Sequence, residues 1–363
     1  MAKTLLTGAT GFIGSRLARA LVQRGDDLRV TVRERSPVEV LEGVDCEQVR
    51  CDVTDRRAVR RALKGVDRVF HAAGVTSIRE GDAERMFEVN VGGAKMVLGE
   101  CLRADVTRVV LTSSAAALGP ASPGGTADET QLFTAGHLDI PYVNSVHEAE
   151  LEAMRLAARG LPLVCVNPAV TFGSGDVHVT STRIVRSFLL GRVPMYSGGA
   201  FCMVDVRDVV RGHLLADEVG GVAERYVLGG RNYTFDRFFA DLGRIAGVAP
   251  PVRIPGTLAA VGARALGVAG RPPLHSSELS AARHWWTYRA TKAMRELHWR
   301  ARPHEETLEA TVSWHLEREH DRIARTRRSP QLQYRLAGAA LGAVDGALRT
   351  VGQVFGQNAP AGP

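Results

Sequence analysis

The chain has 363 residues, which is enough for one large domain or two smaller ones with a sizeable buried core. Hydrophobic residues make up 45% of it and charged residues 23%, an ordinary globular composition that excludes wholesale disorder. Lys and Arg outnumber Asp and Glu by 46 to 39, so the net charge of +7 permits an anionic ligand but does not indicate nucleic-acid binding.

The five cysteines are scattered, with no C-x-x-C pair among Cys46, Cys51, Cys101, Cys165 and Cys202. This spacing predicts neither a disulfide framework nor a metal site, and it favours a reducing cytoplasm. The chain opens on a strand-like run, and no stretch approaches the ~18 uninterrupted apolar residues of a spanning helix. We therefore expect a cytoplasmic protein without a signal peptide or a membrane-spanning helix.

Short apolar runs alternate with helical patterns through the first half of the chain. The predicted strands are Thr4–Thr7, Leu28–Val32, Val69–Ala72, Val109–Thr112 and Leu163–Val166. The predicted helices are Phe12–Arg24, Ala58–Leu63, about 84–101 and about 142–158. This alternation predicts an α/β fold of the Rossmann type, with a doubly wound parallel sheet.

After Pro168 the alternation becomes irregular and is interrupted by Gly and Pro. This pattern predicts a smaller C-terminal substrate lobe, partly interleaved with the last elements of the sheet. The predicted divisions are a dinucleotide-binding domain at 1–172, a substrate lobe at 173–316 and a tail at 317–363.

The tail begins with a basic stretch, and apolar residues then recur at three- and four-residue steps from Leu332 to Phe355. One interpretation is an amphipathic helix that lies on a membrane surface. The other is a helix that docks on the body or on a partner subunit, or a mobile tail. The glycines within this stretch weaken an isolated helix.

A glycine-rich turn follows the first predicted strand and opens the first predicted helix. Here Gly8 permits a tight turn, Gly11 lets the backbone approach a pyrophosphate, and Gly14 lets the helix pack on the strand. The diphosphate of a dinucleotide would then lie at the positive end of the helix. The predicted contacts in this turn are Gly8, Thr10, Gly11, Phe12, Ile13 and Gly14.

The end of the second predicted strand decides between the two nicotinamide cofactors. An NAD site usually has a carboxylate there for the ribose 2′-hydroxyl, but this chain has Arg33, followed by Arg35. A guanidinium matches a 2′-phosphate, and Arg16 is expected to converge on the same place. The pattern favours NADP over NAD; the alternative is that these arginines are solvated surface residues.

Further motifs resemble the extended short-chain dehydrogenase/reductase family, within the NAD-dependent epimerase/dehydratase superfamily. The likeness runs from Lys3 to about Leu316 and is nearest to the branch of dihydroflavonol reductases and 3β-hydroxysteroid dehydrogenases. It rests on the glycine turn, Cys51-Asp52-Val53, His71-Ala72-Ala73-Gly74, Glu88-Val89-Asn90-Val91, Thr112-Ser113-Ser114-Ala115, the segment around Tyr142, and Asn167-Pro168-Ala169.

The resemblance implies a role for each matching residue. It assigns adenine recognition to Asp52 and Val53, and Pro168 to the loop beneath the nicotinamide. It makes Ser114 and Tyr142 catalytic, and Asn90 a structural and proton-relay residue. The adenosine-lining residues that it implies are Ala72, Ala73 and Gly74. It also implies dimerisation through the helices that carry Asn90 and Tyr142.

One residue departs from the family pattern of a tyrosine followed four positions later by a lysine. The lysine position is Val146, which cannot lower the pKa of the Tyr142 phenol or hold the nicotinamide ribose. Neither His147, which is rotated away on the helix, nor Lys95, which is expected to be solvated, is a strong replacement.

Three functions follow from these observations. The first is an NADP-dependent oxidoreductase, a ketone reductase or alcohol dehydrogenase for a hydrophobic small molecule, covered by the apolar segment Leu258–Leu274. The second is a nucleotide-sugar epimerase or dehydratase, which depends on ribose contacts that Val146 cannot make. The third is a non-catalytic dinucleotide-binding protein that acts as a sensor or partner subunit.

Overall fold

The computed structural model describes residues 2–76, 80–193, 195–254 and 281–327. Its centre is a sheet of seven strands in the order β10-β6-β5-β4-β1-β2-β3, and every neighbouring pair is parallel. The strands are β1 (Lys3–Thr7), β2 (Asp27–Val32), β3 (Glu47–Arg50), β4 (Arg68–His71), β5 (Arg108–Thr112), β6 (Leu163–Pro168) and β10 (Arg225–Leu228). The predicted Rossmann-type parallel sheet is confirmed.

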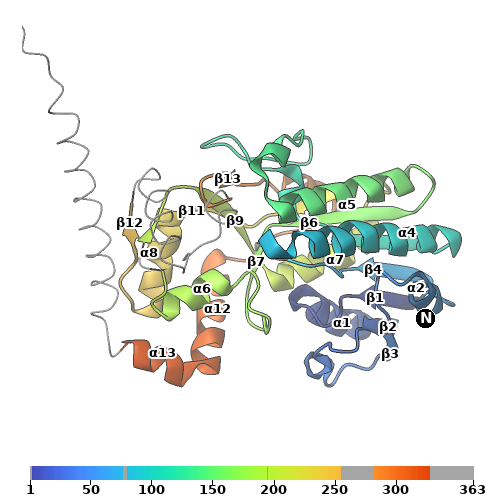
Figure 1. The fold of residues 1–363 in the computed structure, drawn as a ribbon, viewed down its shortest axis with the longest axis horizontal. Coiled ribbons are helices and arrows are strands. Elements are labelled where there is room, and N and C mark those ends of the chain that lie inside the picture. Colours follow the sequence, from blue (N-terminus) through green and yellow to red (C-terminus); the bar gives the residue numbers. More distant parts are fainter. Residues whose placement is uncertain (1, 77–79, 194, 255–280, 328–363) are drawn as a thin grey trace, which may run out of the picture.

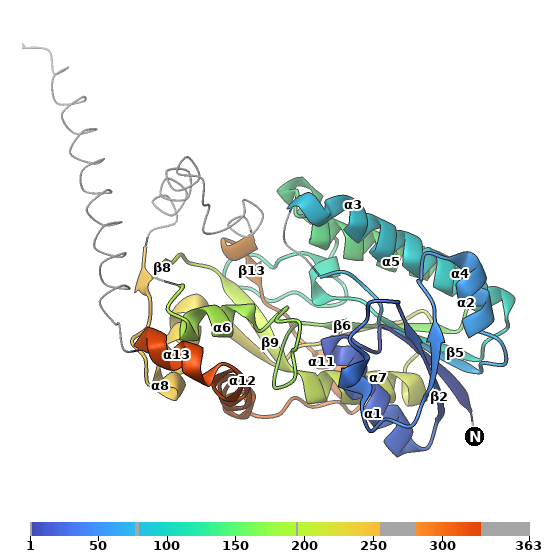
Figure 2. The same ribbon diagram turned by 60° about the horizontal axis from the view of Figure 1, so that its bottom comes forward.

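Helices cover both faces of this sheet, as Figures 1 and 2 show. One face carries α1 (Phe12–Arg24) and α7 (Val206–Val219), and the other carries α2 (Arg56–Ala62), α4 (Ala94–Arg103) and α5 (Pro141–Ala157). In α1, Leu17 and Leu21 are one turn apart and fully buried, so the helix binds the sheet along a single apolar stripe.

The predicted helix at 84–101 consists of three consecutive segments. They are α3 (Ala83–Met86), a π-helical segment (Phe87–Gly93) and α4. Two strands of the sheet were not predicted individually: β3, which is exposed and has a single apolar residue, and β10, which comes from the second half of the chain.

The smaller lobe has a sheet of its own in the order β11-β9-β13, with β7 also paired to β9. Its strands are β7 (Val170–Phe172), β9 (Ala200–Asp205), β11 (Arg231–Thr234) and β13 (Trp285–Trp286), and β8 (Met195–Tyr196) pairs separately with β12 (Val252–Arg253). The helices that pack in this lobe are α6 (Arg183–Leu189), α8 (Phe235–Ala246), α12 (His304–Arg318) and α13 (His320–Arg327), whereas α11 (Thr291–Glu296) packs on β10 of the first sheet. An aromatic core of Phe172, Phe201, Phe238 and Phe239 holds the lobe together.

The chain crosses between the two sheets, because α7 and β10 return to the first sheet after β9 has joined the second. The division expected at residue 316 falls inside α12. The apolar segment Leu258–Leu274 and the amphipathic stretch from Leu332 to Phe355 lie outside the described residues. Within the described residues, no helix has both the length and the apolar character needed to cross a membrane.

Two buried histidines lie inside the sheet domain. His213 of α7 donates from Nδ1 to the Val209 carbonyl (2.8 Å), and its Nε2 accepts from the Thr112 hydroxyl (2.7 Å). His71 of β4 bonds through Nδ1 to the Thr7 hydroxyl at 2.7 Å. Burial lowers the pKa of each imidazole to about 4.

We expect the protein to lose stability between pH 6.5 and about 4, because the unfolded chain takes up protons there that the folded histidines refuse. Each buried histidine contributes about 1.4 kcal/mol per pH unit in this window, and its contribution is complete above pH 6.5. Urea unfolding of His213→Gln at pH 7.5 and pH 5 should therefore show a weaker pH dependence than the wild type. The exposed His320→Gln is the matched control. Equal pH dependence in His213→Gln and the wild type would contradict the expectation.

Candidate active site

In the glycine turn between β1 and α1, close backbone packing requires two of the glycines. Gly8 has a φ of +73°, and a Cβ on it would lie 2.5 Å from the Ala72 carbonyl oxygen. A Cβ on Gly14 would lie 2.1 Å from the Gly8 carbonyl oxygen. Both distances are shorter than a side chain tolerates, so these glycines allow the turn and the close packing of α1.

Gly11 is different, because the protein itself hardly requires it. A Cβ there would meet only the Gly8 carbonyl oxygen, at 3.3 Å, and its φ of −79° suits any residue. Gly11 is the N-cap of α1, and no side chain of the described residues caps this end. The first N–H groups of α1 therefore face the space in front of Gly11, which fits the diphosphate of a dinucleotide.

The other predicted residues of the turn lie around this space. Phe12 is buried and Ile13 is half-buried. The Thr10 carbonyl accepts a hydrogen bond from Nε2 of His178 at 3.1 Å. His178 belongs to the loop between β7 and α6, which sequence reasoning did not connect with this site.

The same loop determines the position of Arg16. Its Nη2 donates to the carbonyl oxygen (2.5 Å) and to the hydroxyl (2.8 Å) of Ser174. A loop 158 residues further along the chain thus engages one nitrogen of its guanidinium, and the convergence of Arg16 with Arg33 stays a prediction. The glycines on either side of Ser174 were the only signal for this contact in the sequence.

The predicted adenosine end of the site carries charges of both signs. Arg33 and Arg35 follow β2 and are exposed. Oδ1 of Asp52 accepts from the N–H (3.0 Å) and the hydroxyl (2.8 Å) of Thr54. Partial burial raises the pKa of the Asp52 carboxyl, but these hydrogen bonds and the charges of Arg33 and Arg85 outweigh it, so the pKa lies below its ordinary value.

The predicted adenosine end of the site also includes Val53, Ala72, Ala73 and Gly74. Val53 is buried against the π-helical segment, where a Cβ on Gly93 would lie 2.8 Å from its side chain. Ala72 and Ala73 are half-buried after β4, and the Ala73 N–H donates to the Thr7 hydroxyl at 3.3 Å.

The Asn90 side chain connects the loop after β4 to α5. Its Oδ1 accepts from the Val75 N–H (2.7 Å), and its Nδ2 donates to the Val75 carbonyl (3.1 Å) and to the Ser145 hydroxyl (3.0 Å). The Ser145 hydroxyl donates in turn to the Tyr142 carbonyl at 2.9 Å. The Asn90 side chain therefore holds the loop after β4 and the first turn of α5 together.

Ser114 and Tyr142 meet at the carboxyl end of the sheet. Ser114 follows β5, and its hydroxyl accepts from the Ala116 N–H at 3.2 Å. Burial raises the pKa of the Tyr142 phenol, and the nearby Ser114 hydroxyl, which lowers it, offsets only part of this effect. Tyr142 is therefore a protonated phenol at neutral pH.

Val146 lies one helical turn beyond Tyr142 on α5 and is half-buried. His147 turns away from the phenol, since its Nδ1 donates to the Ala117 carbonyl at 2.9 Å and its ring stacks on Phe133 at 3.7 Å. Lys95 is solvated, with 67% of its side chain exposed and its Nζ 3.6 Å from Glu152. Both expectations for these alternative cations are confirmed.

Pro168 ends β6 beside Ser114 and is buried. The Asn167 amide before it donates to the Ser114 carbonyl at 3.1 Å. Because all seven strands are parallel, the carboxyl ends of β1, β4, β5 and β6 meet at one edge of the sheet, and most of the predicted residues gather there.

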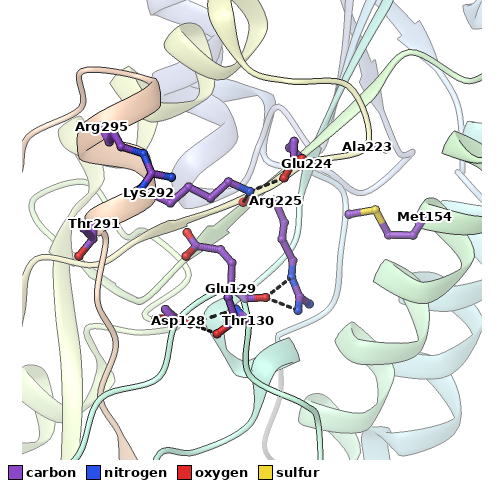
Figure 3. Close-up of a pocket in the computed structure, with 10 residues that line it drawn as sticks. All are labelled: Asp128, Glu129, Thr130, Met154, Ala223, Glu224, Arg225, Thr291, Lys292 and Arg295. Atoms are coloured by element: carbon purple, nitrogen blue, oxygen red, sulfur yellow. Dashed lines mark hydrogen bonds and ion pairs between the residues drawn. The ribbon is translucent and has the colours of Figure 1, made fainter.

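A cavity of about 570 Å³ lies elsewhere, at the outer edge of β10 between α5 and α11 (Figure 3). Its lining is strongly charged, but Lys292 is paired with Glu224, Arg225 with Glu150, and Arg295 with Glu296. The lining residues are Asp128, Glu129, Thr130, Met154, Ala223, Glu224, Arg225, Thr291, Lys292 and Arg295. None of the predicted site residues contributes to this cavity.

The chain is similar in sequence and in fold to several known proteins. The NAD dependent epimerase/dehydratase family matches residues 4–229. Sterol demethylase protein B of Methylococcus capsulatus is 38% identical over 245 residues, covering 67% of this chain and 74% of that protein. Cinnamoyl-CoA reductase 1 of Arabidopsis thaliana is 32% identical over 239 residues, covering 61% and 69%. The crystal structure of gox2253 superimposes with a TM-score of 0.79 at 32% identity, covering 89% of this chain and 99% of that one.

Proposed function

The chain belongs to the NAD dependent epimerase/dehydratase family, and from this premise we propose that it is an NADP-dependent reductase of hydrophobic carbonyl compounds. The observation that carries the proposal is the proximity of the Ser114 hydroxyl to the Tyr142 phenol, whose pKa it lowers, at the carboxyl end of the sheet. Two hydroxyl groups at one point are suited to bind a carbonyl oxygen and to protonate it.

When bound, the reduced nicotinamide supplies the hydride for the carbonyl carbon. Ser114 donates a hydrogen bond to the carbonyl oxygen, and Tyr142 donates the proton that the resulting alkoxide needs. Tyr142 is suited to this direction because its phenol stays protonated at neutral pH, and an alkoxide is a stronger base than a phenolate and takes the proton. Oxidation of an alcohol would instead require the phenolate as a base, and burial disfavours the phenolate.

The preference for NADP rests on the residue directly after β2. Arg33 stands there in place of a carboxylate, and Arg35 is exposed beside it. A guanidinium binds a phosphate through two parallel hydrogen bonds and has less to offer a bare ribose hydroxyl.

Arg33→Asp should weaken NADPH binding about tenfold or more and change NADH binding by less than about threefold, since only NADPH loses a phosphate contact and gains a repulsion. Fluorescence titration with both cofactors measures this difference. The control is Arg159→Asp, which changes the net charge equally at an exposed residue just beyond the C-terminal end of α5. Equal losses for NADPH and NADH would remove the proposed preference.

A hydrophobic substrate is supported by the apolar surroundings of Tyr142. The neighbouring Val143 belongs to a small cluster with Ala135 and Ile140, against which Phe133 and Trp286 pack. Two relatives are named for a sterol and for cinnamoyl-CoA, and the sterol skeleton and the cinnamoyl group are apolar. A panel of hydrophobic ketones and aldehydes, assayed by NADPH oxidation, tests the proposal.

The non-catalytic alternative is favoured by one specific observation, which is Val146 beside Tyr142. On that alternative the protein binds NADPH but oxidises it with no member of the carbonyl panel. The epimerase activity of the family has less support here, because Val146 cannot hold the nicotinamide ribose through a turnover. Cofactor retained in the purified protein would support it.

A further inference from the structure

A buried carboxylate lies behind the Ser114–Tyr142 pair. Glu150 of α5 is 3% exposed, and it is bound by one side chain directly after β5, one in β6 and one in β10. The Ser113 hydroxyl and the Asn167 amide (2.5 Å) donate to its Oε2, and Nη1 of Arg225 donates to its Oε1 at 3.0 Å. Both oxygens of this carboxylate are therefore engaged by groups at the edge of the sheet.

Two of these partners lead directly to Ser114. Ser113 precedes it in the chain, and Nδ2 of Asn167 donates to both Glu150 and the Ser114 carbonyl, the latter at 3.1 Å. The Glu150 carboxylate therefore holds Ser114 in two ways. It binds the residue before Ser114, and it binds the amide that contacts the Ser114 carbonyl oxygen.

The third partner anchors the carboxylate from the other side. The Arg225 guanidinium also donates to the Glu129 carbonyl, from Nε at 3.1 Å and from Nη2 at 2.6 Å, as Figure 3 shows. Arg225 compensates the charge of Glu150 in a place from which water is largely excluded. The position of the carboxylate is therefore determined by β10 as well as by α5.

Glu150 lies two helical turns after Tyr142 on the same helix. One side chain of the helix that carries the phenol thereby binds the strand end that carries the hydroxyl. We propose that Glu150 is a positioning residue, which holds the Ser114 segment beside Tyr142, where the two hydroxyls can bind one carbonyl oxygen.

This inference rests on the proposed roles of Ser114 and Tyr142, but it makes a claim of its own. A purely structural ion pair would contribute stability and leave the Ser114–Tyr142 contact unchanged in the folded variant. A positioning residue alters that contact even in a folded variant that binds cofactor normally. The two roles are therefore separated by a measurement on the phenol itself.

The test is the ¹³Cζ resonance of Tyr142 in protein labelled at its six tyrosines, assigned by its loss in Tyr142→Phe. Ser114→Ala removes the hydroxyl beside the phenol and defines the direction in which the resonance moves. Glu150→Gln, which keeps the size but not the charge, is expected to move the resonance in the same direction. The control Glu148→Gln, on an exposed position of the same helix, should leave it in place.

The turnover of Glu150→Gln should also fall about tenfold or more while its NADPH dissociation constant stays within about threefold of the wild type, because the pair that binds the carbonyl is displaced and the dinucleotide turn is not. Where Glu150→Gln does not fold, Ser113→Ala carries the test, since it removes one donor to the carboxylate.

The positioning role is overturned if the Tyr142 resonance moves in Ser114→Ala but stays in place in Glu150→Gln, or in Ser113→Ala where that variant replaces it. That result leaves the proposed function intact. An unmoved resonance in Ser114→Ala itself refutes the Ser114–Tyr142 contact, and with it both proposals. A shift in Glu148→Gln as large as that in Glu150→Gln also overturns the positioning role.

Discussion

Replacing Val146 with lysine is expected to raise NADPH-dependent turnover about tenfold or more, since tuned acid–base catalysis is worth roughly 10²–10⁴-fold. Tyr142 already has its Ser114 partner, but burial raises the pKa of the phenol. An ammonium one helical turn away lowers that pKa and makes the phenol a better acid. Because Val146 is half-buried, the longer side chain has room at the surface of α5.

Steady-state assays on a hydrophobic ketone measure the effect of this substitution, and the variants Tyr142→Phe and Val146→Met complete the comparison. Tyr142→Phe should lose nearly all turnover, because it removes the proton donor. Val146→Met adds length without charge and should resemble the wild type. If Val146→Lys and Tyr142→Phe both turn over at the wild-type rate, the assigned active site is wrong.

The pH dependence of the same variants provides a second measure. Ionisation of Tyr142 removes its proton and ends the reduction at high pH. The lysine variant should therefore lose activity at a lower pH than the wild type does, because its phenol has a lower pKa. An alkaline limb that Val146→Lys does not move would show that another group donates the proton.

Alanine at Gly11 and alanine at Gly14 are expected to have opposite consequences, although the two glycines are three positions apart. At Gly14 the new Cβ would lie 2.1 Å from the Gly8 carbonyl oxygen, so the turn between β1 and α1 must distort. The expected loss of folding stability is about 3 kcal/mol, at the upper end of what overpacking usually costs. At Gly11 the contact of 3.3 Å is only slightly tight, and the fold should remain stable.

The Gly11 variant should instead lose affinity for the cofactor. Its methyl group would occupy the space in front of the first N–H groups of α1, where the diphosphate is expected. Loss of one charge-assisted hydrogen bond of about 1.5–3 kcal/mol corresponds to roughly 10–100-fold weaker NADPH binding. Thermal unfolding and fluorescence titration of both variants separate the two effects. Unchanged NADPH affinity in a folded Gly11→Ala protein would mean that the dinucleotide does not lie against this turn.

Short-range patterns in the sequence were sufficient for the elements that carry the site. Phe12–Arg24 was predicted with the observed limits, because Gly11 and Gly25 flank a regular spacing of Leu17 and Leu21. The meeting of Ser114 and Tyr142 agrees with the order of the motifs, since parallel strands bring their carboxyl ends to one edge of the sheet.

Other features of the site depend on contacts between distant parts of the chain. The pairing of Arg16 with Ser174 spans 158 residues, and that of Arg225 with Glu150 spans 75. The spacing of a short motif contains no information on such partners. For the same reason the raised pKa of Tyr142 could not be predicted, because it depends on how deeply the phenol is buried.

The sequence by itself determined the parallel α/β architecture, the dinucleotide turn and the absence of a lysine beside Tyr142, because hydrophobic periodicity, backbone freedom and residue identity are local properties. Only the tertiary structure decided that packing requires Gly8 and Gly14 but not Gly11, and that Arg16 bonds to Ser174. It also brought Glu150 behind Ser114. The physical reason is that a steric conflict or a buried charge is created by neighbours, and folding alone brings those neighbours together.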